Sequence, residues 1–212
     1  HGKSSGWSKP SSFQMGLLNQ NDWKAKWIEA GQKEDENDRP SQLFRKTFNT
    51  SKKVASATAY ITAHGMYEAY LNGQRIGDAW LTPGWTSYNN RLQYQTYDVT
   101  DLIRNGKNAI GAELGNGWYR SVLGWRNNGN IYGKTLGLLV QLHIKYADGS
   151  EDVIASDASW KSETGAITYS QIYNGETIDA RKEKENWKNA SYNDAGWAAV
   201  SVKDYPLTNI IA

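Results

Sequence analysis

Carboxylates and amides gather in one short segment in the last third of the chain. Residues 173–181, YNGETIDAR, carry Glu176, Asp179 and Arg181 behind a tight Asn-Gly turn at Asn174. Carboxylate and amide oxygens accept hydrogen bonds from sugar hydroxyls and also coordinate hard cations such as Ca²⁺. An internal Asp179–Arg181 pair that fixes the loop is the structural alternative, and the two roles are compatible.

A second group of ligand-type residues lies at residues 115–120, GNGWYR. Glycines on both sides of Asn116 suit a backbone that comes close to a ligand, and Trp118 or Tyr119 can stack on the apolar face of a sugar ring. Glu68 borders another strand and loop, where a carboxylate is either exposed or a ligand to hydroxyls. A packed corner is the structural alternative for 115–120.

Catalytic patterns are absent from the sequence. Glycoside hydrolysis needs two carboxylates on either side of one bond, and no such pair is recognisable. Asp78 and Asp98 fit turns, and Glu113 alternates with apolar neighbours as a solvent-facing strand residue does. The chain has no Gly-x-Ser-x-Gly elbow, no Cys, and three His without metal-ligand spacing. The sequence therefore predicts a domain without catalytic activity of its own.

The composition excludes several classes of partner. The 212 residues include 24 Lys and Arg against 22 Asp and Glu, a formal charge of +2 that argues against nucleic acid. No apolar run reaches the roughly 18 residues of a membrane span, so no membrane is expected. The chain opens at His1 without an export signal, which favours a piece of a longer protein and leaves the compartment open.

Short alternating strands separated by turn signals dominate the chain after a polar loop at 31–41. Asn72-Gly73 is a strong hairpin signal, because both central residues of such a turn need positive φ. No long window has the apolar spacing of a helix. The pattern predicts an all-β fold, a jelly-roll β-sandwich. Strands are expected at 13–18, 43–48, 54–63, 67–71, 92–97, 108–114, 136–146, 151–155, 159–162, 167–171 and 197–202.

Two long stretches without strand signals, 80–91 and 115–134, are rich in aromatic residues. Loops of this length in a compact domain usually carry function. The chain has 10 Trp and 13 Tyr against 3 Phe, and these two types suit wet binding surfaces. The first stretch ends at Arg91, and the aromatics of both are Trp80, Trp85, Tyr88, Trp118, Tyr119, Trp125 and Tyr132.

Longer motifs then resemble one family. YITAHGMYEAYLNGQRIGD is followed by LTPGWTSYNNRLQYQTYDVT, GKNAIGAELGNGWYR and IYNGETIDAR. Over residues 27–203 the chain resembles the N-terminal β-sandwich domain of bacterial α-L-rhamnosidases of glycoside hydrolase family 78, and more loosely the galactose-binding-like jelly rolls. The resemblance implies that residues 1–26 are the end of a fibronectin-like domain plus a linker, and that 204–212 lead towards a further domain.

The resemblance also implies a division of labour. In that family a separate (α/α)₆ barrel supplies the acid and base of an inverting reaction, so this chain would be a non-catalytic part of a hydrolase. Related carbohydrate-binding modules of family 67 bind terminal L-rhamnose with a calcium ion, through positions matching 66–68 and Asn116. Here Tyr67 and Glu68 stand where an Asp-Asn pair is expected.

The leading prediction is a carbohydrate-binding or substrate-positioning domain for L-rhamnose or a rhamnose-containing glycan, with the catalytic domain of the same parent chain as its partner. The alternative is a structural domain that braces the catalytic barrel. Calcium is a candidate ligand of Glu68, Asn116 and Glu176. The predicted sugar-binding residues are Glu68, Trp85, Arg91, Asn116, Trp118, Tyr119, Trp125, Asn174 and Glu176.

Overall fold

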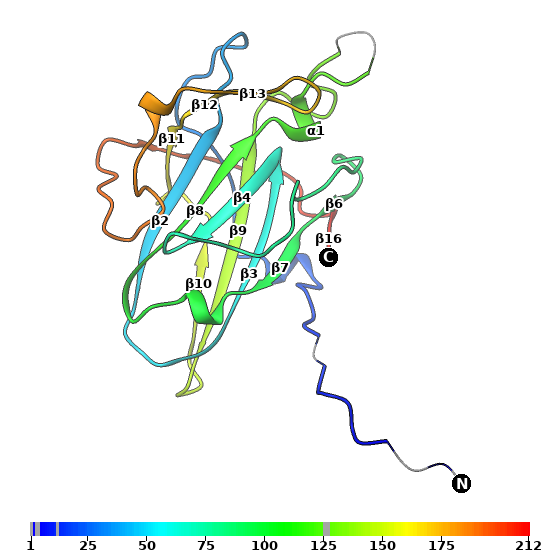
Figure 1. Cartoon of the computed structure of the whole chain (residues 1–212), viewed down its shortest axis with the longest axis vertical. Coiled ribbons are helices and arrows are strands. Elements are labelled where there is room, and N and C mark those ends of the chain that lie inside the picture. The colour runs from blue at the N-terminus through cyan, green and yellow to red at the C-terminus, as the bar shows by residue number, and fades with distance from the viewer. Residues whose placement is uncertain (1, 3–4, 12, 125–127) are drawn as a thin grey trace.

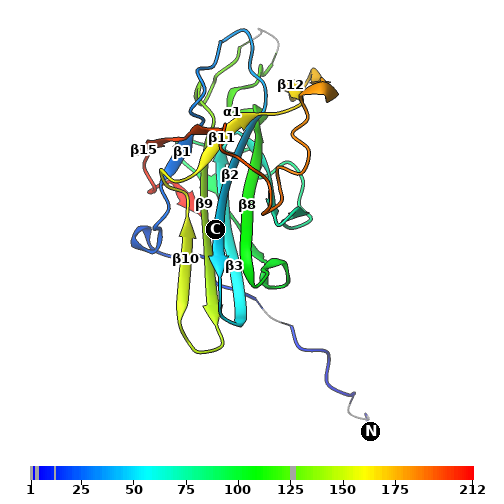
Figure 2. The ribbon, with the colours of Figure 1, turned by 90° about the vertical axis from the view of Figure 1, so that its left-hand side faces the viewer.

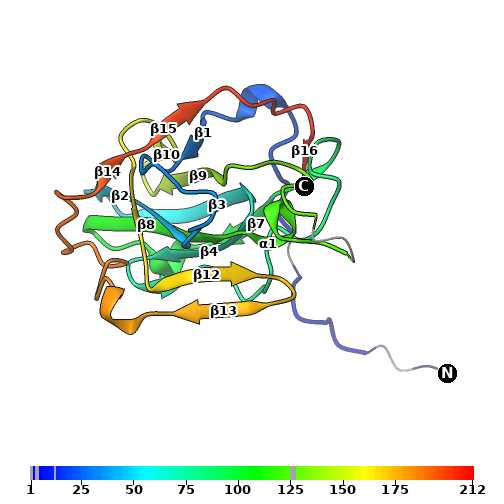
Figure 3. The same ribbon diagram turned by 90° about the horizontal axis from the view of Figure 1, so that it is seen from above.

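Two antiparallel β-sheets pack face to face in the computed structural model, which describes residues 2, 5–11, 13–124 and 128–212. Figure 3 shows the sheets as two layers. The first sheet has the order β15-β1-β9-β3-β7, with β10 beside β9. Its strands are β1 (Trp27–Glu29), β3 (Val54–His64), β7 (Gln95–Asp98), β9 (Gly137–Tyr146), β10 (Glu151–Ala155) and β15 (Ser201–Lys203).

The second sheet has the order β14-β11-β2-β8-β4-β5, and two further strand pairs lie beside the sandwich. The predicted all-β sandwich is therefore confirmed. The second sheet contains β2 (Gln42–Thr50), β4 (Met66–Leu71), β5 (Gln74–Arg75), β8 (Gly106–Gly115), β11 (Lys161–Thr164) and β14 (Ala198–Ala199). The separate pairs are β12 (Ile167–Gln171) with β13 (Gly175–Ile178), and β6 (Leu92–Gln93) with β16 (Ile210–Ile211).

Side-chain alternation decides which face of a strand is buried. In β4, Tyr67, Ala69 and Leu71 are buried, whereas Glu68 and Tyr70 are half-buried. Successive side chains of a strand point to opposite faces. Strand β4 therefore gives its apolar set to the core between the sheets and presents Glu68 on the outer face of the second sheet.

Later segments cover this outer face. Leu43 of β2 packs with Trp187 and Trp197 in a small cluster of its own. The β12–β13 hairpin lies outside the same sheet (Figure 3). Figures 1 and 2 show the hairpin, the loop of residues 31–41 and the one-turn helix α1 (Gly117–Arg120) at the same end of the sandwich. This end collects the segments that the sequence predicted to be functional.

The β4–β5 hairpin turns on Asn72 and Gly73 as predicted, with φ of 53° and 86°. The side chain of Asn72 also ties the turn to neighbouring segments. Its Nδ2 donates to the Leu102 carbonyl and its Oδ1 accepts from the Ala109 N–H, each at 2.9 Å. One residue thus combines the left-handed conformation with buried hydrogen bonds.

We expect Asn72→Ala to lower the free energy of unfolding by about 2–3 kcal/mol, because buried partners lose their hydrogen bonds and alanine is strained at positive φ. Urea denaturation measures this loss. Asn89→Ala, at an exposed position, is the matched control and should stay within about 0.5 kcal/mol of the parent. Equal effects of the two substitutions would contradict the proposed role of Asn72.

Two regions differ from what the sequence suggested. Residues 13–18 form no strand and are mostly exposed. The loop at 31–41 is more than a solvated connection, because Glu34 forms an ion pair with the buried Arg120 at 2.6 Å. The strand predicted at 13–18 was wrong, since a lone apolar run forms a stable strand only when it pairs with a neighbouring one.

Helices are short and few. The described residues contain the α-helix α1 and three 3₁₀ turns, η1 (Gln20–Asp22), η2 (Thr100–Leu102) and η3 (Ala180–Lys182). Within the described part of the chain, no helix has the length and apolar character needed to cross a bilayer.

Candidate functional site

A pocket of about 380 Å³ is lined by residues of the second sheet and of the β12–β13 hairpin. We call it the carboxylate pocket. Strands β4 and β8 supply its floor, the hairpin one wall, and the loop after β5 another. It is lined by Ser41, Met66, Tyr67, Glu68, Trp80, Leu81, Glu113, Gly115, Ile167, Ser170 and Glu176.

Two carboxylates of the pocket are cross-strand neighbours. Glu68 of β4 stands opposite Glu113 of β8 in the antiparallel register. Ser41 Oγ donates to Glu113 Oε1 at 2.6 Å. Burial raises the pKa of the Glu113 carboxyl above its usual value, and the Glu68 charge acts in the same direction. Glu113 is therefore not the solvent-facing residue expected, and a carboxylate pair exists that the sequence did not reveal.

The Glu68 carboxylate is hydrogen-bonded and still partly accessible to solvent. Its Oε2 accepts from the Tyr70 hydroxyl at 2.6 Å, and its side chain is 41% exposed. Burial and, as the second-largest cause, the hydrogen bond to Glu68 raise the pKa of Tyr70, so this hydroxyl remains a donor at neutral pH. Glu176, on the exposed strand β13, brings a third carboxylate to the pocket.

Trp80 lines the edge of the pocket. It was not among the sugar-binding residues predicted from the sequence. The side chain is 72% exposed, and the Arg75 guanidinium carbon lies 4.1 Å from its ring centroid. The loop is fastened to β4 by reciprocal bonds, from Tyr67 N to Thr82 O and from Thr82 Oγ1 to Tyr67 O, both 2.8 Å. The richness of 80–91 in aromatics was the available signal.

Asn116 is buried and binds one wall of the pocket. The residue is 2% exposed. Its Nδ2 donates to the Ser170 carbonyl at 2.6 Å, and its Oδ1 accepts from Arg120 Nε at 2.5 Å. Both amide atoms are thus engaged within the fold. Since Ser170 lines the pocket, Asn116 holds the hairpin wall in place.

Two of the other predicted aromatics form a separate, partly exposed pair. Trp85 and Trp118 stack with ring centroids 6.1 Å apart and planes at 4°, and Trp85 Nε1 donates to the Tyr132 hydroxyl at 3.0 Å. Tyr119 is buried and stacks on His64 with centroids 4.9 Å apart. None of these rings lines the carboxylate pocket.

The remaining predicted residues lie apart. Arg91 is exposed at the end of its loop. Asn174 is exposed at the tip of the hairpin, where its Nδ2 donates to the Tyr169 hydroxyl at 3.0 Å. Trp125 lies outside the described residues. The structure therefore brings Glu68 and Glu176 to one pocket, connects Asn116 to its hairpin wall, and leaves the others elsewhere.

Two of the three expected calcium ligands, Glu68 and Glu176, line one pocket. Among the described residues, no three His, Asp or Glu side chains group as a metal site. The Oδ1 of Asn116 already faces a guanidinium. Asp179 binds Arg181 through two bonds of 2.8 Å, which confirms the structural alternative for that pair. Of the expected calcium ligands, the oxygen of Asn116 is therefore already engaged by a cation.

The fold and the pocket define a β-sandwich module whose candidate site lies on the outside of one sheet. Residues 52–212 match the α-L-rhamnosidase N-terminal domain family. The chain belongs to this family, as the motifs in its sequence indicated.

Relatives place the module within much longer proteins. An α-L-rhamnosidase of Formosa agariphila is 42% identical over 218 residues, covering 99% of this chain and 23% of that protein. The crystal structure of native α-L-rhamnosidase from Aspergillus terreus is similar with a TM-score of 0.89 and 44% identity, over 92% of this chain and 23% of that one. Streptomyces avermitilis α-L-rhamnosidase, solved in complex with L-rhamnose, gives 0.78 and 42%, over 82% and 17%. The chain thus spans about a quarter or less of these relatives.

Proposed function

We propose that the chain is a non-catalytic domain of an α-L-rhamnosidase and binds or positions a terminal L-rhamnose unit in the carboxylate pocket. This proposal rests on one observation: three carboxylates and one exposed tryptophan line the same pocket. They are Glu68, Glu113, Glu176 and Trp80. The L-rhamnose complex of the Streptomyces relative supports the choice of sugar.

The chemistry of the pocket suits a neutral sugar. Ionised carboxylates form strong hydrogen bonds with hydroxyl donors. The exposed face of Trp80 can cover the apolar face of the ring. A monosaccharide has few atoms with which to contribute binding energy, so the affinity should be weak. The hydrolysis itself would belong to another domain of the parent protein, whose catalytic domain is then the partner of this module.

Calorimetric titration of methyl α-L-rhamnoside into the chain tests this proposal. We expect Glu176→Gln and Trp80→Ala each to weaken binding by about tenfold or more, because each removes a charged hydrogen bond or a stacking surface. Glu151→Gln, on β10, and Trp7→Ala, in the exposed N-terminal segment, are matched controls that should bind as the parent does.

Repeating the titration with calcium and then with a chelator decides the metal question. Binding that survives the chelator would assign the site to side chains alone, as the geometry favours. Binding that disappears would show that a metal completes the pocket when sugar is present.

The structural alternative rests on the Trp85–Trp118 pair, in which Trp85 is exposed and Trp118 is half-buried. Large exposed apolar surfaces mark interfaces. If this pair packs against the catalytic domain, the separate chain should self-associate in sedimentation experiments and Trp85→Ser should reduce the association. Absence of heat with L-rhamnose up to tens of millimolar would favour this bracing role over sugar binding.

Because Glu68 and Glu113 form a carboxylate pair, the chain should also be assayed for hydrolysis of an aryl rhamnoside. True turnover would contradict both the sugar-binding and the bracing function.

A further inference from the structure

Glu113 lies on the floor of the carboxylate pocket, although it was not among the sugar-binding residues predicted from the sequence. On strand β8 it stands between Leu43 of β2 and Glu68 of β4 in the antiparallel registers. Leu43 is buried, so one neighbour of Glu113 is apolar and the other is a second carboxylate. Residues directly opposite on antiparallel strands have Cβ atoms about 4.5–5.5 Å apart. The two carboxylates therefore share one pocket floor.

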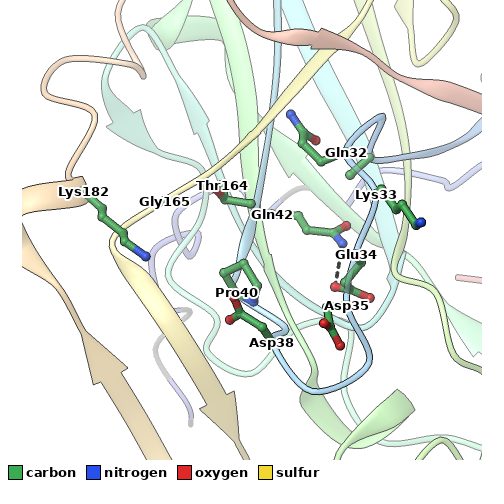
Figure 4. A pocket seen from close by; sticks show the side chains of 11 residues that line it. Gln32, Lys33, Glu34, Asp35, Asp38, Pro40, Gln42, Thr164, Gly165 and Lys182 are labelled. Carbon is green, nitrogen blue, oxygen red and sulfur yellow. Dashed lines mark hydrogen bonds between the residues drawn. The ribbon is translucent and has the colours of Figure 1, made fainter.

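One oxygen of Glu113 is bound within the fold. Ser41 Oγ donates to Oε1 at 2.6 Å. Gly165 lies against the same atom, since a Cβ added to this glycine would stand 3.4 Å from Oε1. Thr164 and Gly165 connect β11 to β12, and they also line a neighbouring pocket of about 330 Å³ (Figure 4). Oε1 therefore faces protein atoms that hold the carboxylate in one orientation.

The other oxygen of Glu113 is open to the carboxylate pocket. Among the described residues, Oε2 has no hydrogen-bond partner, and it is not one of the unpaired side-chain atoms that the fold seals from solvent. Because the half-buried Glu113 lines the pocket, a ligand there can reach this oxygen. Hydrogen bonds from hydroxyl groups to an ionised carboxylate are roughly twice as strong as neutral ones. Oε2 is thus an accessible and oriented acceptor.

The surroundings of Glu113 determine the pH at which it takes up a proton. Burial raises the pKa of its carboxyl, and the Glu183 and Glu68 charges act in the same direction. The Ser41 hydrogen bond and the Lys188 charge oppose this shift, but the pKa remains raised. Glu113 therefore binds a proton at a higher pH than an ordinary glutamate, whose pKa is about 4.3.

The other charged groups of the pocket lie nearer to Glu68 or on the hairpin. Arg75 Nε stands 3.9 Å from Glu68 Oε2, and the Tyr70 hydroxyl donates to the same oxygen at 2.6 Å. Glu176 is exposed on β13 and adds a further negative charge. Glu68 thus has a cation beside it, whereas the hydrogen bond to Glu113 comes from a neutral hydroxyl. The two neighbouring carboxylates are therefore not equivalent.

We propose that Glu113 Oε2 accepts a hydrogen bond from one hydroxyl of the sugar in the carboxylate pocket, and that a proton taken up by Glu113 weakens this binding. The inference rests on the proposed sugar binding and adds the residue that sets its pH range. Since Oε1 already accepts from Ser41, the proton goes to Oε2, the atom that faces the sugar. The charged acceptor is then lost. Binding is full above the pKa of Glu113 and weakens as the pH falls through it.

Calorimetric titrations of methyl α-L-rhamnoside into the 212-residue chain between pH 8 and 5 test this inference. The range ends above the pKa of about 4 of the buried His64. We expect the affinity of the parent to fall by about five- to tenfold towards pH 5. Glu113→Gln keeps an acceptor for Ser41 but carries no charge, so it should bind at pH 8 as weakly as the parent in acid, without pH dependence. Glu151→Gln, on β10, is the control and should keep the parent profile.

Two neighbours of Glu113 allow the pH dependence to be shifted in opposite directions. The ¹³C NMR signal of the Glu113 carboxyl, assigned by its absence from Glu113→Gln, follows the proton without sugar. Ser41→Ala removes a hydrogen bond that lowers the pKa of Glu113, so the carboxyl midpoint and the loss of sugar should both move to higher pH. Glu183→Gln removes a charge that raises this pKa and should move both to lower pH. A merely structural role of Glu113 would not move the two midpoints together.

The possible results separate this inference from the proposed function. Midpoints for the carboxyl and for sugar binding that coincide, and that shift together in the two variants, support it. Sugar binding that is unchanged from pH 8 to 5 overturns it and leaves the sugar site intact. A pH dependence that persists in Glu113→Gln overturns it in favour of another titrating group. Absence of binding at every pH overturns both this inference and the sugar site.

Discussion

Replacement of Glu34 by glutamine is expected to lower the free energy of unfolding by about 3 kcal/mol or more, because it leaves a buried guanidinium without its counter-charge. The Arg120 side chain is fully buried, whereas Glu34 is 21% exposed. Asn116 Oδ1 and the Lys134 carbonyl also accept from Arg120, but neither carries a charge. Burial lowers the pKa of Arg120 and the Glu34 carboxylate opposes this effect.

Chemical denaturation measures the loss, and the same loop offers a matched control. Glu36 pairs with Lys134 at 3.3 Å, but both side chains are about 70% exposed. Glu36→Gln should therefore cost less than about 1 kcal/mol. Arg120→Met combined with Glu34→Met should recover much of the loss, because the pair is then replaced by apolar groups. Equal losses for the two glutamine variants would show that the buried guanidinium does not depend on Glu34.

The strands were predictable because their signals are local. Alternation and turn residues placed β3, β4, β9 and β10 within one or two residues, and the Asn72-Gly73 turn has the expected positive φ. Each of these features is decided within a few residues of sequence. The isolated apolar run at 13–18 has the same local pattern and no partner strand, and so the same reasoning failed there.

The site was predictable only in part, because its geometry depends on distant pairings. Glu68 and Glu176 were expected, and the hairpin fold brings them to one pocket. The Glu68–Glu113 pair depends on the register of β4 against β8, which no local pattern specifies. The Glu34–Arg120 pair joins residues 86 positions apart. The charged loop at 31–41 therefore looked like a solvated connection, although one of its carboxylates neutralises a buried cation.

Acidification from pH 6.5 to 4 is expected to remove about 3 kcal/mol of stability through one histidine. His64 lies between Trp27 and Tyr119, with ring centroids 4.1 and 4.9 Å away. Its Nδ1 is buried and has no hydrogen-bond partner among the described residues. Burial lowers the pKa of His64 from 6.5 to about 4.

Proton binding determines whether stability rises or falls with pH. Between pH 6.5 and 4 the unfolded chain binds a proton at this histidine and the folded chain does not, so stability falls as the pH falls and levels off below 4. A tenfold difference between the proton affinities of the folded and unfolded chains corresponds to about 1.4 kcal/mol. His64→Phe keeps a ring in the stack and removes the titration.

Urea denaturation of both proteins at several pH values isolates this contribution, since the other titrating groups are common to both. The stability of the parent relative to His64→Phe should fall by about 3 kcal/mol across the window. His143→Gln is the control, because His143 is only partly buried and should produce a smaller change. Parallel curves for the parent and His64→Phe would show that His64 is not buried as described. Tyr119 stacks on His64 and belongs to the same turn as Arg120, which donates to Asn116 Oδ1, and Asn116 in turn binds the Ser170 carbonyl. Disturbing this stack in acid should therefore also loosen the hairpin wall of the carboxylate pocket.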